Sequence, residues 1–466
     1  MRSSIIISRV IKKIATAFTS DAEGTERQSQ TLNAKTYSVK QHKINKALMS
    51  PNAIKVTDGL QKAGYEAYLV GGCVRDSLLG LSPKDFDVAT NATPEQIKAT
   101  FRNCRLIGRR FRLAHVLFGR EIIEVATFRG HHDEASSEDK KGKQSSDGQL
   151  LRDNVYGNIQ EDAQRRDFNI NAMYYNPSTQ EVTDFAGGID ALKSGEFALI
   201  GDAETRYRED PVRMLRAIRF SAKLNMRIEP SAADAIHSLN HLLSNIPPAR
   251  LFEEVLKLFL AGKAVKTYEL LQTYGLFGVL FPQLQPLLQD SNSKETLFLE
   301  NVLENTDKRI NNDQRVTPAF IYAAFLWYPL EERTDQIIQE AGLSRYDAFM
   351  MAQGEVLHRQ VQRIMIPKRF STVIRDIWIL QQRLPRRFGK RAYQALAHPK
   401  FRAGYDFLLM RGEVEGGELL ELGQWWTKFQ HAAPSVQKTM LSSLRHDGPK
   451  KHKRRRPKRA VSKNND

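Results

Sequence analysis

The sequence has few cysteines and no long apolar run. Only Cys73 and Cys104 occur among 466 residues, and neither has a cysteine or histidine partner at zinc-ligand spacing, which excludes a disulfide framework and a zinc module. No apolar stretch approaches the roughly 20 residues that cross a bilayer. The length allows about two to four compact units. These features predict a multidomain protein of the reducing cytoplasm.

Two common nucleotide-binding motifs are also missing, because the chain contains neither a G-x-G-x-x-G fingerprint nor a Walker lysine. The chain instead carries a paired glycine, Gly71 and Gly72, followed after a helix-sized interval by Asp85 and Asp87. Glycines without a Cβ let a phosphate approach the backbone, and residues 73–79 can begin a helix whose N-terminus favours an anion. This half of the pattern predicts phosphate binding.

The two aspartates indicate that a metal-binding part accompanies the phosphate-binding glycines. If they lie on a strand, its period of two puts Asp85 and Asp87 on one face and sends Phe86 and Val88 into the core. Adjacent carboxylates repel each other unless divalent cations lie between them, and hard oxygen ligands of this kind suit Mg²⁺. Either motif alone could be an ordinary turn. Together, with Arg75 between them, they predict nucleotidyl transfer.

A third carboxylate follows in the next predicted hairpin, formed by residues 116–118 and 122–128. The alternation around Glu124 could turn this side chain toward Asp85 and Asp87. The polar face of an edge strand is an equally simple interpretation of the same pattern.

Further along, Arg165, Arg166 and Asp167 are consecutive. Two arginines can neutralise a triphosphate, and Asp167 can hold an arginine, a metal-bound water or an attacking hydroxyl. A purely structural Arg–Asp pair is the alternative.

A helix is predicted to begin at Asp210, with Asp210 as N-cap and Pro211 at the first helical position. Arg213, Arg216 and Arg219 recur every three residues and form a charged stripe on that helix. Asp210 and Arg213 lie one turn apart, where an acceptor and a donor could together read the edge of a base. A solvated basic stripe behind an ordinary cap is the alternative.

The formal net charge of +17 indicates a polyanionic partner or an anionic membrane surface. Residues 445–466 hold ten Lys or Arg and two Asp, about half of that excess, and should form a disordered arm that binds phosphates. Residues 386–402 interleave cations with aromatics, as in surfaces that stack single-stranded RNA, although core aromatics would give a similar pattern. The candidate RNA-binding residues are Arg386, Arg387, Lys390, Arg391, Arg454, Arg455 and Arg456.

The order of patterns predicts an α+β fold, in which a head built on a small mixed sheet precedes mainly helical segments. In the head, residues 53–63 and 94–101 are predicted helices, the second with Thr93 as N-cap and Pro94 at the first helical position. Residues 1–18 interleave apolar and basic side chains, which suits a helix on a membrane surface, a partner-binding helix or a frayed terminus. Residues 19–45 look like a linker. The predicted division is a flexible segment 1–49, a head 50–204 with a flexible insertion 131–150, a helical neck 205–280, a helical body 281–440 and a disordered basic tail 441–466.

Three ordered motifs in this chain resemble the bacterial poly(A) polymerases and CCA-adding enzymes, the class II tRNA nucleotidyltransferases. The resemblance covers about residues 50–280 and continues more loosely to about residue 430. It implies that Asp85 and Asp87 bind two Mg²⁺ ions, with Mn²⁺ as an alternative, and that Asp167 is a further active-site carboxylate. The residues implied to contact ATP are Gly71, Gly72, Arg75, Arg166, Asp210, Arg213, Arg216 and Arg219.

Residues 106–116 resemble a signature of the poly(A) polymerase branch. The resemblance therefore implies template-independent transfer of AMP from ATP to RNA 3′ ends, with release of pyrophosphate, feeding RNA turnover. The expected partners are mRNA, regulatory RNA and tRNA fragments, RNA-degradation or RNA-chaperone proteins, and a membrane surface touched peripherally, but not DNA. A CCA-adding enzyme and a catalytically idle RNA-binding adaptor are the alternatives.

Overall fold

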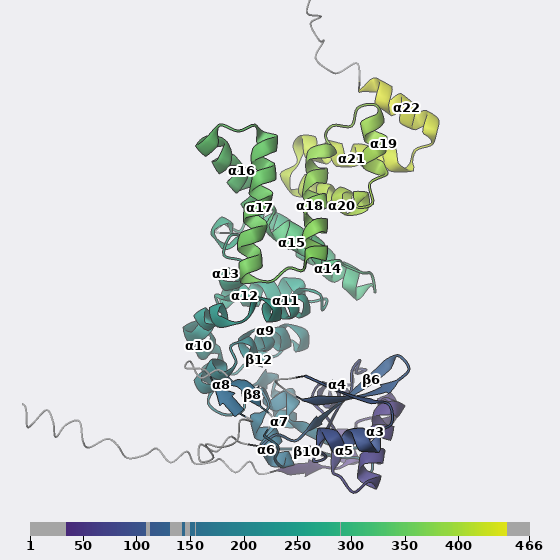
Figure 1. The fold of residues 1–466 in the computed structure, drawn as a ribbon, viewed down its shortest axis with the longest axis vertical. Helices are drawn as coiled ribbons and strands as arrows, with labels where there is room; N and C mark the ends of the chain where they lie inside the picture. The colour runs from purple at the N-terminus through teal and green to yellow at the C-terminus, as the bar shows by residue number, and fades with distance from the viewer. Residues whose placement is uncertain are drawn as a thin grey trace, which may run out of the picture.

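The computed structural model describes residues 34–108, 112–130, 142–144, 150–153, 155–288 and 290–444. Figure 1 shows an elongated molecule, with a sheet-containing head at one end and helices stacked away from it. The predicted α+β class is confirmed. The predictions for residues 1–33, for 109–111 and for the basic arm with Arg454, Arg455 and Arg456 lie outside the described residues.

An eight-stranded mixed sheet forms the centre of the head, in the order β1-β10-β9-β2-β3-β6-β5-β4. Strands β3 and β6 run parallel, and the other described neighbours in this sheet are antiparallel. The strands are β1 (Lys35–Tyr37), β2 (Ala67–Val70), β3 (Asp87–Thr90), β4 (Cys104–Ile107), β5 (Leu113–Phe118), β6 (Glu121–Thr127), β9 (Met173–Asn176) and β10 (Glu181–Asp184). The predicted hairpin of β5 and β6 is present.

Helices cover both faces of the sheet. Helix α3 (Pro51–Lys62) and α5 (Pro94–Thr100) pack their apolar sides into one core, and α6 (Ile159–Arg165) contributes to a core that includes Ala89 and Tyr174. The predicted start of α5 is confirmed, because Thr93 caps it in a reciprocal pair with Gln96. Both faces of β3 are therefore buried beyond its first residue.

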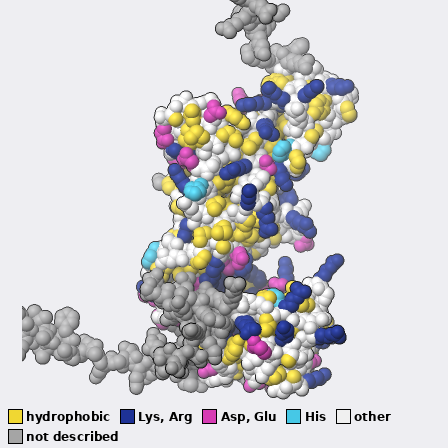
Figure 2. Space-filling model, viewed as in Figure 1, with side chains coloured by type: hydrophobic (Ala, Val, Ile, Leu, Met, Phe, Trp, Pro, Cys, Tyr) yellow, Lys and Arg dark blue, Asp and Glu magenta, His cyan; other side chains and the backbone are white. Residues whose placement is uncertain are grey.

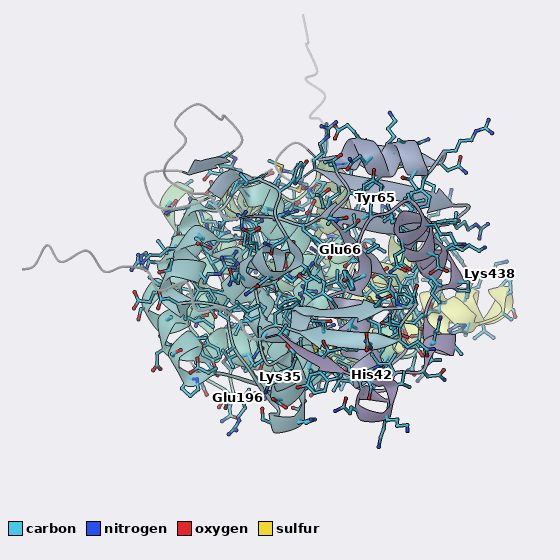
Figure 3. All side chains as sticks on the ribbon, turned by 90° about the horizontal axis from the view of Figure 1, so that it is seen from below. Lys35, His42, Tyr65, Glu66, Glu196 and Lys438 are labelled. Atoms are coloured by element: carbon cyan, nitrogen blue, oxygen red, sulfur yellow. The ribbon has the colours of Figure 1, made fainter. Side chains whose placement is uncertain are left out.

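The ordered head begins earlier than the sequence predicts. Strand β1 pairs with β10, the side chains of Ile44 and Met49 are buried, and His42 Nε2 lies 2.9 Å from the Gln180 carbonyl oxygen. The predictions of a linker to residue 45 and a flexible segment to residue 49 are therefore wrong from Lys35 onward. The segment has little apolar periodicity because few of its residues, among them Ile44 and Met49, contribute to the core of the head. Figure 3 shows Lys35 and His42 along one side of the head.

A chain that begins at Ser50 should be less stable than one that begins at Ala34. The shorter chain exposes the contacts of Ile44 and Met49, and burying two such side chains is worth about 3–6 kcal/mol. Thermal unfolding of the two truncated proteins, followed by circular dichroism, measures the difference. Equal melting temperatures would show that this segment does not stabilise the head.

Two further predicted boundaries differ from the structure. Within the predicted insertion, β7 (Gly142–Gln144) pairs with β8 (Leu150–Asp153), and the remaining residues of 131–149 lie outside the described residues. Helix α22 (Pro434–Ser443) crosses the predicted start of the tail at residue 441, because Pro434 at the first helical position begins a new helix there.

Helices make up most of the described residues from 203 to 444, as predicted. The bounds are α7 (Gly188–Ser194), α8 (Ala203–Glu209), α9 (Val212–Leu224), α10 (Pro230–Leu239), α11 (Pro248–Phe259), α12 (Ala264–Thr273), α13 (Leu276–Leu280), α14 (Lys294–Asn311), α15 (Pro318–Phe325), α16 (Trp327–Ala341), α17 (Arg345–Arg363), α18 (Lys368–Arg383), α19 (Lys390–Leu396), α20 (Phe401–Glu415) and α21 (Gly417–His431). A small parallel pair, β11 (Glu196–Phe197) with β12 (Arg227–Ile228), joins the head to the neck.

One hydrophobic core runs across the predicted boundary between neck and body at residue 280. It extends from Phe168 near the head to Met410 on α20 without interruption. A separate cluster lies around Trp426 and includes Leu384 and Leu441. The packing therefore joins neck and body into one unit, with a smaller helical unit at the far end (Figure 1).

Candidate active site

The glycine pair forms the turn between β2 and helix α4 (Gly72–Leu78). Gly71 has φ of +74°, which side chains with a Cβ rarely adopt, so this position requires glycine. A methyl group placed on Gly71 would lie 3.9 Å from Arg166 Nη1 and 4.0 Å from the Asp87 Oδ2 atom. The turn therefore brings the backbone next to both a guanidinium and a carboxylate.

Asp85 and Asp87 follow the predicted alternation. Both are exposed, whereas Phe86 and Val88 are buried. The strand is shorter than predicted, since β3 begins at Asp87 and Asp85 lies in the loop before it. Asp87 pairs with Val70, the last residue of β2. Its carboxylate therefore lies at the end of two central strands, beside the glycine turn.

The carboxylate of Asp87 is surrounded by protein atoms and by negative charge, although the residue keeps an exposed surface. Desolvation, followed by the charge of Glu124 and then that of Asp85, raises the pKa of Asp87 to about 6, against the lowering effect of Arg166. The site thus holds an excess of negative charge that a cation would neutralise.

Glu124 lies beside Asp87, as one of the two interpretations of its pattern predicts. The two residues are register partners in the parallel pair of β3 and β6. On its other side Glu124 pairs with His115 of β5, and His115 Nε2 lies 3.3 Å from Glu124 Oε1. Three adjacent strands therefore place Asp87, Glu124 and His115 in a row.

Arg166 is held beside the glycine turn by two buried partners. It donates from Nη2 to Asp162 Oδ2 at 2.8 Å and from Nε to the Tyr174 hydroxyl at 2.8 Å, and it stacks over the Tyr174 ring. Its neighbour Arg165 turns away and donates to the carbonyl oxygen of Gly130. The geometry separates the two arginines that the sequence predicts as a pair.

Asp167 forms an ion pair with Arg216. Arg216 Nε donates to Asp167 Oδ2 at 2.6 Å, and Asn171 Nδ2 donates to Oδ1 at 3.2 Å. Burial alone would raise the pKa of Asp167, but the Arg216 charge and hydrogen bond lower it to about 2. Asp167 therefore stays ionised and holds an arginine, one of the roles that its sequence context allows.

Arg75 is almost completely buried, with 3% of its surface exposed. It donates to Asp76 Oδ1 at 2.8 and 2.6 Å and to Asn171 Oδ1 at 2.7 Å, and its guanidinium lies over the ring of Phe220. Lys223 of α9 forms an ion pair with the other oxygen of Asp76, at 3.0 Å. In this position Arg75 joins the glycine turn to α9.

Helix α9 begins at Val212 with Pro211 as its N-cap, one residue later than predicted. The preceding residues form their own helix, α8, and Asp210 ends it. Asp210 still accepts a hydrogen bond from the Val212 amide at 3.3 Å. Its carboxylate also accepts hydrogen bonds from Arg250 Nη1 and Nη2, at 2.8 and 2.6 Å.

The arginine stripe of α9 is only partly exposed, and apolar residues of the helix are buried on both sides of it. Arg213 donates to Glu209 Oε2 at 2.8 Å and to the carbonyl oxygen of Arg206 at 2.7 Å. Arg219 lies over Phe220, and within the described part of the chain its Nε has no hydrogen-bond acceptor. Burial and then the Arg216 charge lower the pKa of Arg219. Arg219 is therefore a cation suited to an anionic ligand.

Residues 386–402 divide between surface and core. Arg386, Lys390 and Arg391 are exposed, as is Phe388, whereas Phe401 is buried in the far helical unit. Arg387 lies over the ring of Trp425, with 5.1 Å between the guanidinium carbon and the ring centre. The interpretation as core aromatics therefore holds for Phe401, whereas RNA binding by the exposed cations stays a prediction.

Several residues of the site were missed by the sequence analysis. Asp162 precedes Arg166 by four residues on one helix, a spacing that could have indicated the pair. Arg206 Nη2 donates to the carbonyl oxygens of Arg165 and Arg166, at 2.7 Å each. For Arg206 and Arg250 no sequence signal exists, because each reaches its partners across about 40 residues of chain.

Among the described residues, those of the candidate site included, no group of three or more histidine, cysteine, aspartate or glutamate side chains is arranged to hold a metal ion. Across the same residues, none of the helices is both long and apolar enough to span a membrane.

Comparison with known families matches three parts of the chain. Residues 67–198 match the poly A polymerase head domain, residues 225–288 the family described as "probable RNA and SrmB-binding site of polymerase A", and residues 341–460 the polymerase A arginine-rich C-terminus. The head match contains the glycine turn and the aspartates.

Known structures with similar folds include CCA-adding enzymes. An apo form of a CCA-adding enzyme has a TM-score of 0.58 at 20% identity, covering 89% of this chain and 95% of that one. The Thermotoga maritima CCA-adding enzyme complexed with tRNA has a TM-score of 0.51 at 20% identity, covering 88% and 99%. At this identity the likeness establishes the fold alone.

Other relatives are more similar to this chain in sequence than these structures are. Poly(A) polymerase I of Salmonella typhimurium is 54% identical over 421 residues, 90% of each chain, and that of Haemophilus influenzae is 52% identical over 416 residues, 88% of this chain and 91% of the relative. A CCA-adding enzyme of Lactobacillus delbrueckii is 36% identical over 217 residues, 47% of this chain and 52% of the relative. The chain therefore belongs to the bacterial poly(A) polymerase I family of polynucleotide adenylyltransferases.

Proposed function

We propose that this protein transfers AMP from ATP to the 3′ ends of RNA without a template and releases pyrophosphate. The observation that carries the proposal is the glycine turn, which faces Asp87 on one side and Arg166 on the other. A carboxylate that can hold a cation and a guanidinium that can hold a phosphate thus border one stretch of exposed backbone. Membership of the poly(A) polymerase I family supports this substrate assignment over CCA addition.

Asp85, Asp87 and Glu124 are the residues that would hold divalent cations. Their oxygen donors fit Mg²⁺, which commonly takes one or two carboxylates and completes its shell with water and substrate phosphates. Such ions, when bound, lower the pKa of the attacking hydroxyl and neutralise charge on the departing pyrophosphate.

The other residues of the site would bind and orient the triphosphate. Arg166, Arg216 and Arg219 supply positive charge, and Arg166 and Arg216 are each fixed by an aspartate. Phosphoryl-type transfer depends mainly on positioning and charge neutralisation, so rigid arginines are useful here. We assign Arg75 a positioning role, since its donors are used inside the protein.

Selection of adenine is proposed for Asp210 and Arg213. A carboxylate oxygen can accept from the amino group of adenine, and the guanidinium can donate to a ring nitrogen. Arg250 and Glu209 fix these two side chains before a base arrives. A rigid pair discriminates better than a mobile one, because a wrong base leaves buried polar groups without partners.

Replacement of Arg250 by alanine should therefore weaken base selection more than catalysis. We expect the ratio of kcat/KM for ATP to that for CTP to fall about tenfold, the value of one lost charged hydrogen bond. Arg250→Lys keeps the charge but loses the two-pronged contact, and should give an intermediate ratio. An unchanged ratio in both variants would remove Arg250 from nucleotide selection.

The activity itself is tested with purified protein, Mg²⁺, a 5′-labelled RNA of arbitrary sequence and each nucleoside triphosphate in turn. Long ladders with ATP alone support the proposal. A parallel reaction uses tRNA that lacks its 3′ end. A CTP-dependent product that stops after the CCA sequence would transfer the protein to CCA addition, and no extension of any RNA would leave only RNA binding.

A further inference from the structure

A cavity lies in the helical body, among helices that Figure 1 shows stacked away from the head. Helices α14, α18 and α20 and the start of α15 enclose a volume of about 530 Å³. Cavities that bind drug-sized ligands measure about 300–1,000 Å³, so this one can hold a nucleotide. None of the residues that line it belongs to the proposed catalytic site.

The cavity is electrostatically asymmetric. Cations gather at one end, where the last turn of α14 and the loop after it meet the start of α20, and these cations are Arg309, Arg315, Lys400 and Arg402. Arg402 forms an ion pair with Asp406 at 3.0 Å. Within the described part of the chain, Arg315 and Lys400 are not ion-paired, which leaves their charges available. Figure 2 shows Lys and Arg side chains gathered along this side of the body.

The opposite end of the cavity carries a carboxylate in place of cations. Three turns further along α20, Glu413 accepts a hydrogen bond from Asn301 of α14 at 2.9 Å, and Asn305 lines the cavity between the two ends. A phosphate placed there would be repelled by Glu413. A carboxylate oxygen does suit the exocyclic amino group of adenine, cytosine or guanine, which uracil lacks.

Apolar side chains form the wall between these ends. Phe320, Val373, Leu409 and Met410 line the cavity, and Phe320 is fixed by contact with the ring of Phe407. Aromatic and apolar surfaces of this kind stack nucleic-acid bases without requiring a particular sequence. The cavity thus offers, in order, phosphate binding, base stacking and an acceptor for an amino group.

We propose that this cavity binds one nucleotide of the RNA strand upstream of its 3′ end, with the phosphate at the cationic end and an adenine base preferred. The inference rests on the proposed function, which supplies a strand that ends in adenylates. Binding a distant nucleotide holds the RNA on the enzyme while its 3′ end is extended in the head. The cavity is then a second contact that only a sufficiently long RNA can reach.

The test compares two charge-matched double variants. Arg315→Gln with Lys400→Gln removes two cations of the cavity that are not ion-paired, so the fold should survive. Lys308→Gln with Lys438→Gln removes two exposed cations of the body, one on α14 next to Arg309 and one on α22, neither of which lines the cavity. Figure 3 marks Lys438.

Fluorescence anisotropy measures the affinity of each protein for oligo(A) of increasing length. The wild-type and control proteins should show a marked rise in affinity once the RNA reaches the cavity. The cavity variant should lose this rise, about five- to tenfold in affinity for long RNA, and its salt slope should fall by about 1 as contacts to phosphate are lost. Extension of the shortest primers should be equal in all three proteins.

Two further measurements define the ligand. Oligo(U) should gain less affinity with length than oligo(A), and Ala403→Phe, which fills the cavity without changing its charge, should reproduce the loss. An unchanged length dependence in both cavity variants overturns the proposal. So does competition by free AMP at millimolar concentration without any effect of RNA length, which would identify a site for free nucleotide. Failure of every protein to extend short primers would instead contradict the proposed function.

Discussion

Replacement of Asp87 by asparagine is expected to abolish AMP transfer and to leave the protein as stable as before. Asp87 lies at the edge of the sheet, beside the glycine turn and next to Glu124, so its charge is central to any cation held there. Loss of a metal-binding carboxylate should reduce kcat at least about a thousandfold, because charge neutralisation supplies much of the catalysis in phosphoryl-type transfer. Primer extension with ATP and Mg²⁺ measures the loss.

The stability of the same variant follows from the sign of the pKa shift. The folded protein raises the pKa of Asp87 above its ordinary value, to about 6. Any stability from this group is therefore complete below pH 4 and is lost as the pH rises through 6, so at pH 8 the ionised carboxylate contributes none. A neutral amide should give an equal or higher melting temperature in metal-free buffer.

A matched control separates the catalytic role from a general loss of charge. Glu181 is an exposed residue of β10 in the same sheet, and Glu181→Gln should retain full activity. Mg²⁺ with ATP should raise the melting temperature of the wild type and of this control by mass action, and should raise that of Asp87→Asn much less. Retained extension by Asp87→Asn would remove Asp87 from the proposed metal site.

The central part of the site could be predicted because its signals are local. The glycine turn and the aspartates lie within 17 residues, where strand periodicity and helix-start rules apply directly. The same rules identify α3, α5 and the hairpin of β5 and β6. Each of these elements is favoured by its own side chains, and tertiary packing stabilises the same local structure.

Contacts between distant segments could not be predicted in this way. The sequence gives Asp210 no indication of Arg250, because the two meet only after α8, α9 and α11 have packed together. Strand β1 could not be predicted for another reason. Its three residues carry too little apolar pattern to indicate a strand, and they are ordered by pairing with β10. Arg75 resembles a phosphate ligand in the motif, yet the aromatic ring of Phe220 and the side chain of Asn171 enclose it.

Replacement of Asp167 by asparagine should lower stability, in contrast to Asp87. Asp167 and Arg216 have 13% and 32% of their side-chain surfaces exposed, and their ion pair joins the head to α9. The lowered pKa of about 2 means that ionised Asp167 stabilises the fold above pH 4 and that this contribution is lost as the pH falls through 2. Relative to an ordinary aspartate, the shift corresponds to about 2–3 kcal/mol at neutral pH.

A double-mutant cycle measures this coupling. Asp167→Asn and Arg216→Gln should each destabilise the protein, because each leaves its partner's charge alone. The double variant removes both charges and should be less destabilised than the sum of the two. Urea unfolding of the wild type and the three variants provides the free energies of unfolding. The exposed pair of Lys266 and Glu269 serves as control, since its coupling should be close to zero. Additive effects at Asp167 and Arg216 would contradict a stabilising ion pair.

The activities of the same variants decide what Asp167 does in the reaction. If Asp167 acts by holding Arg216 against the triphosphate, each single variant and the double variant should lose a similar amount of activity, because all three lack one positioned arginine. If Asp167 also contacts the RNA hydroxyl or a metal-bound water, Asp167→Asn should lose more than Arg216→Gln, and its loss should appear in kcat and not in the KM for ATP. The geometry favours the first result, since Arg216, Asn171 and the Phe168 amide already bind the carboxylate.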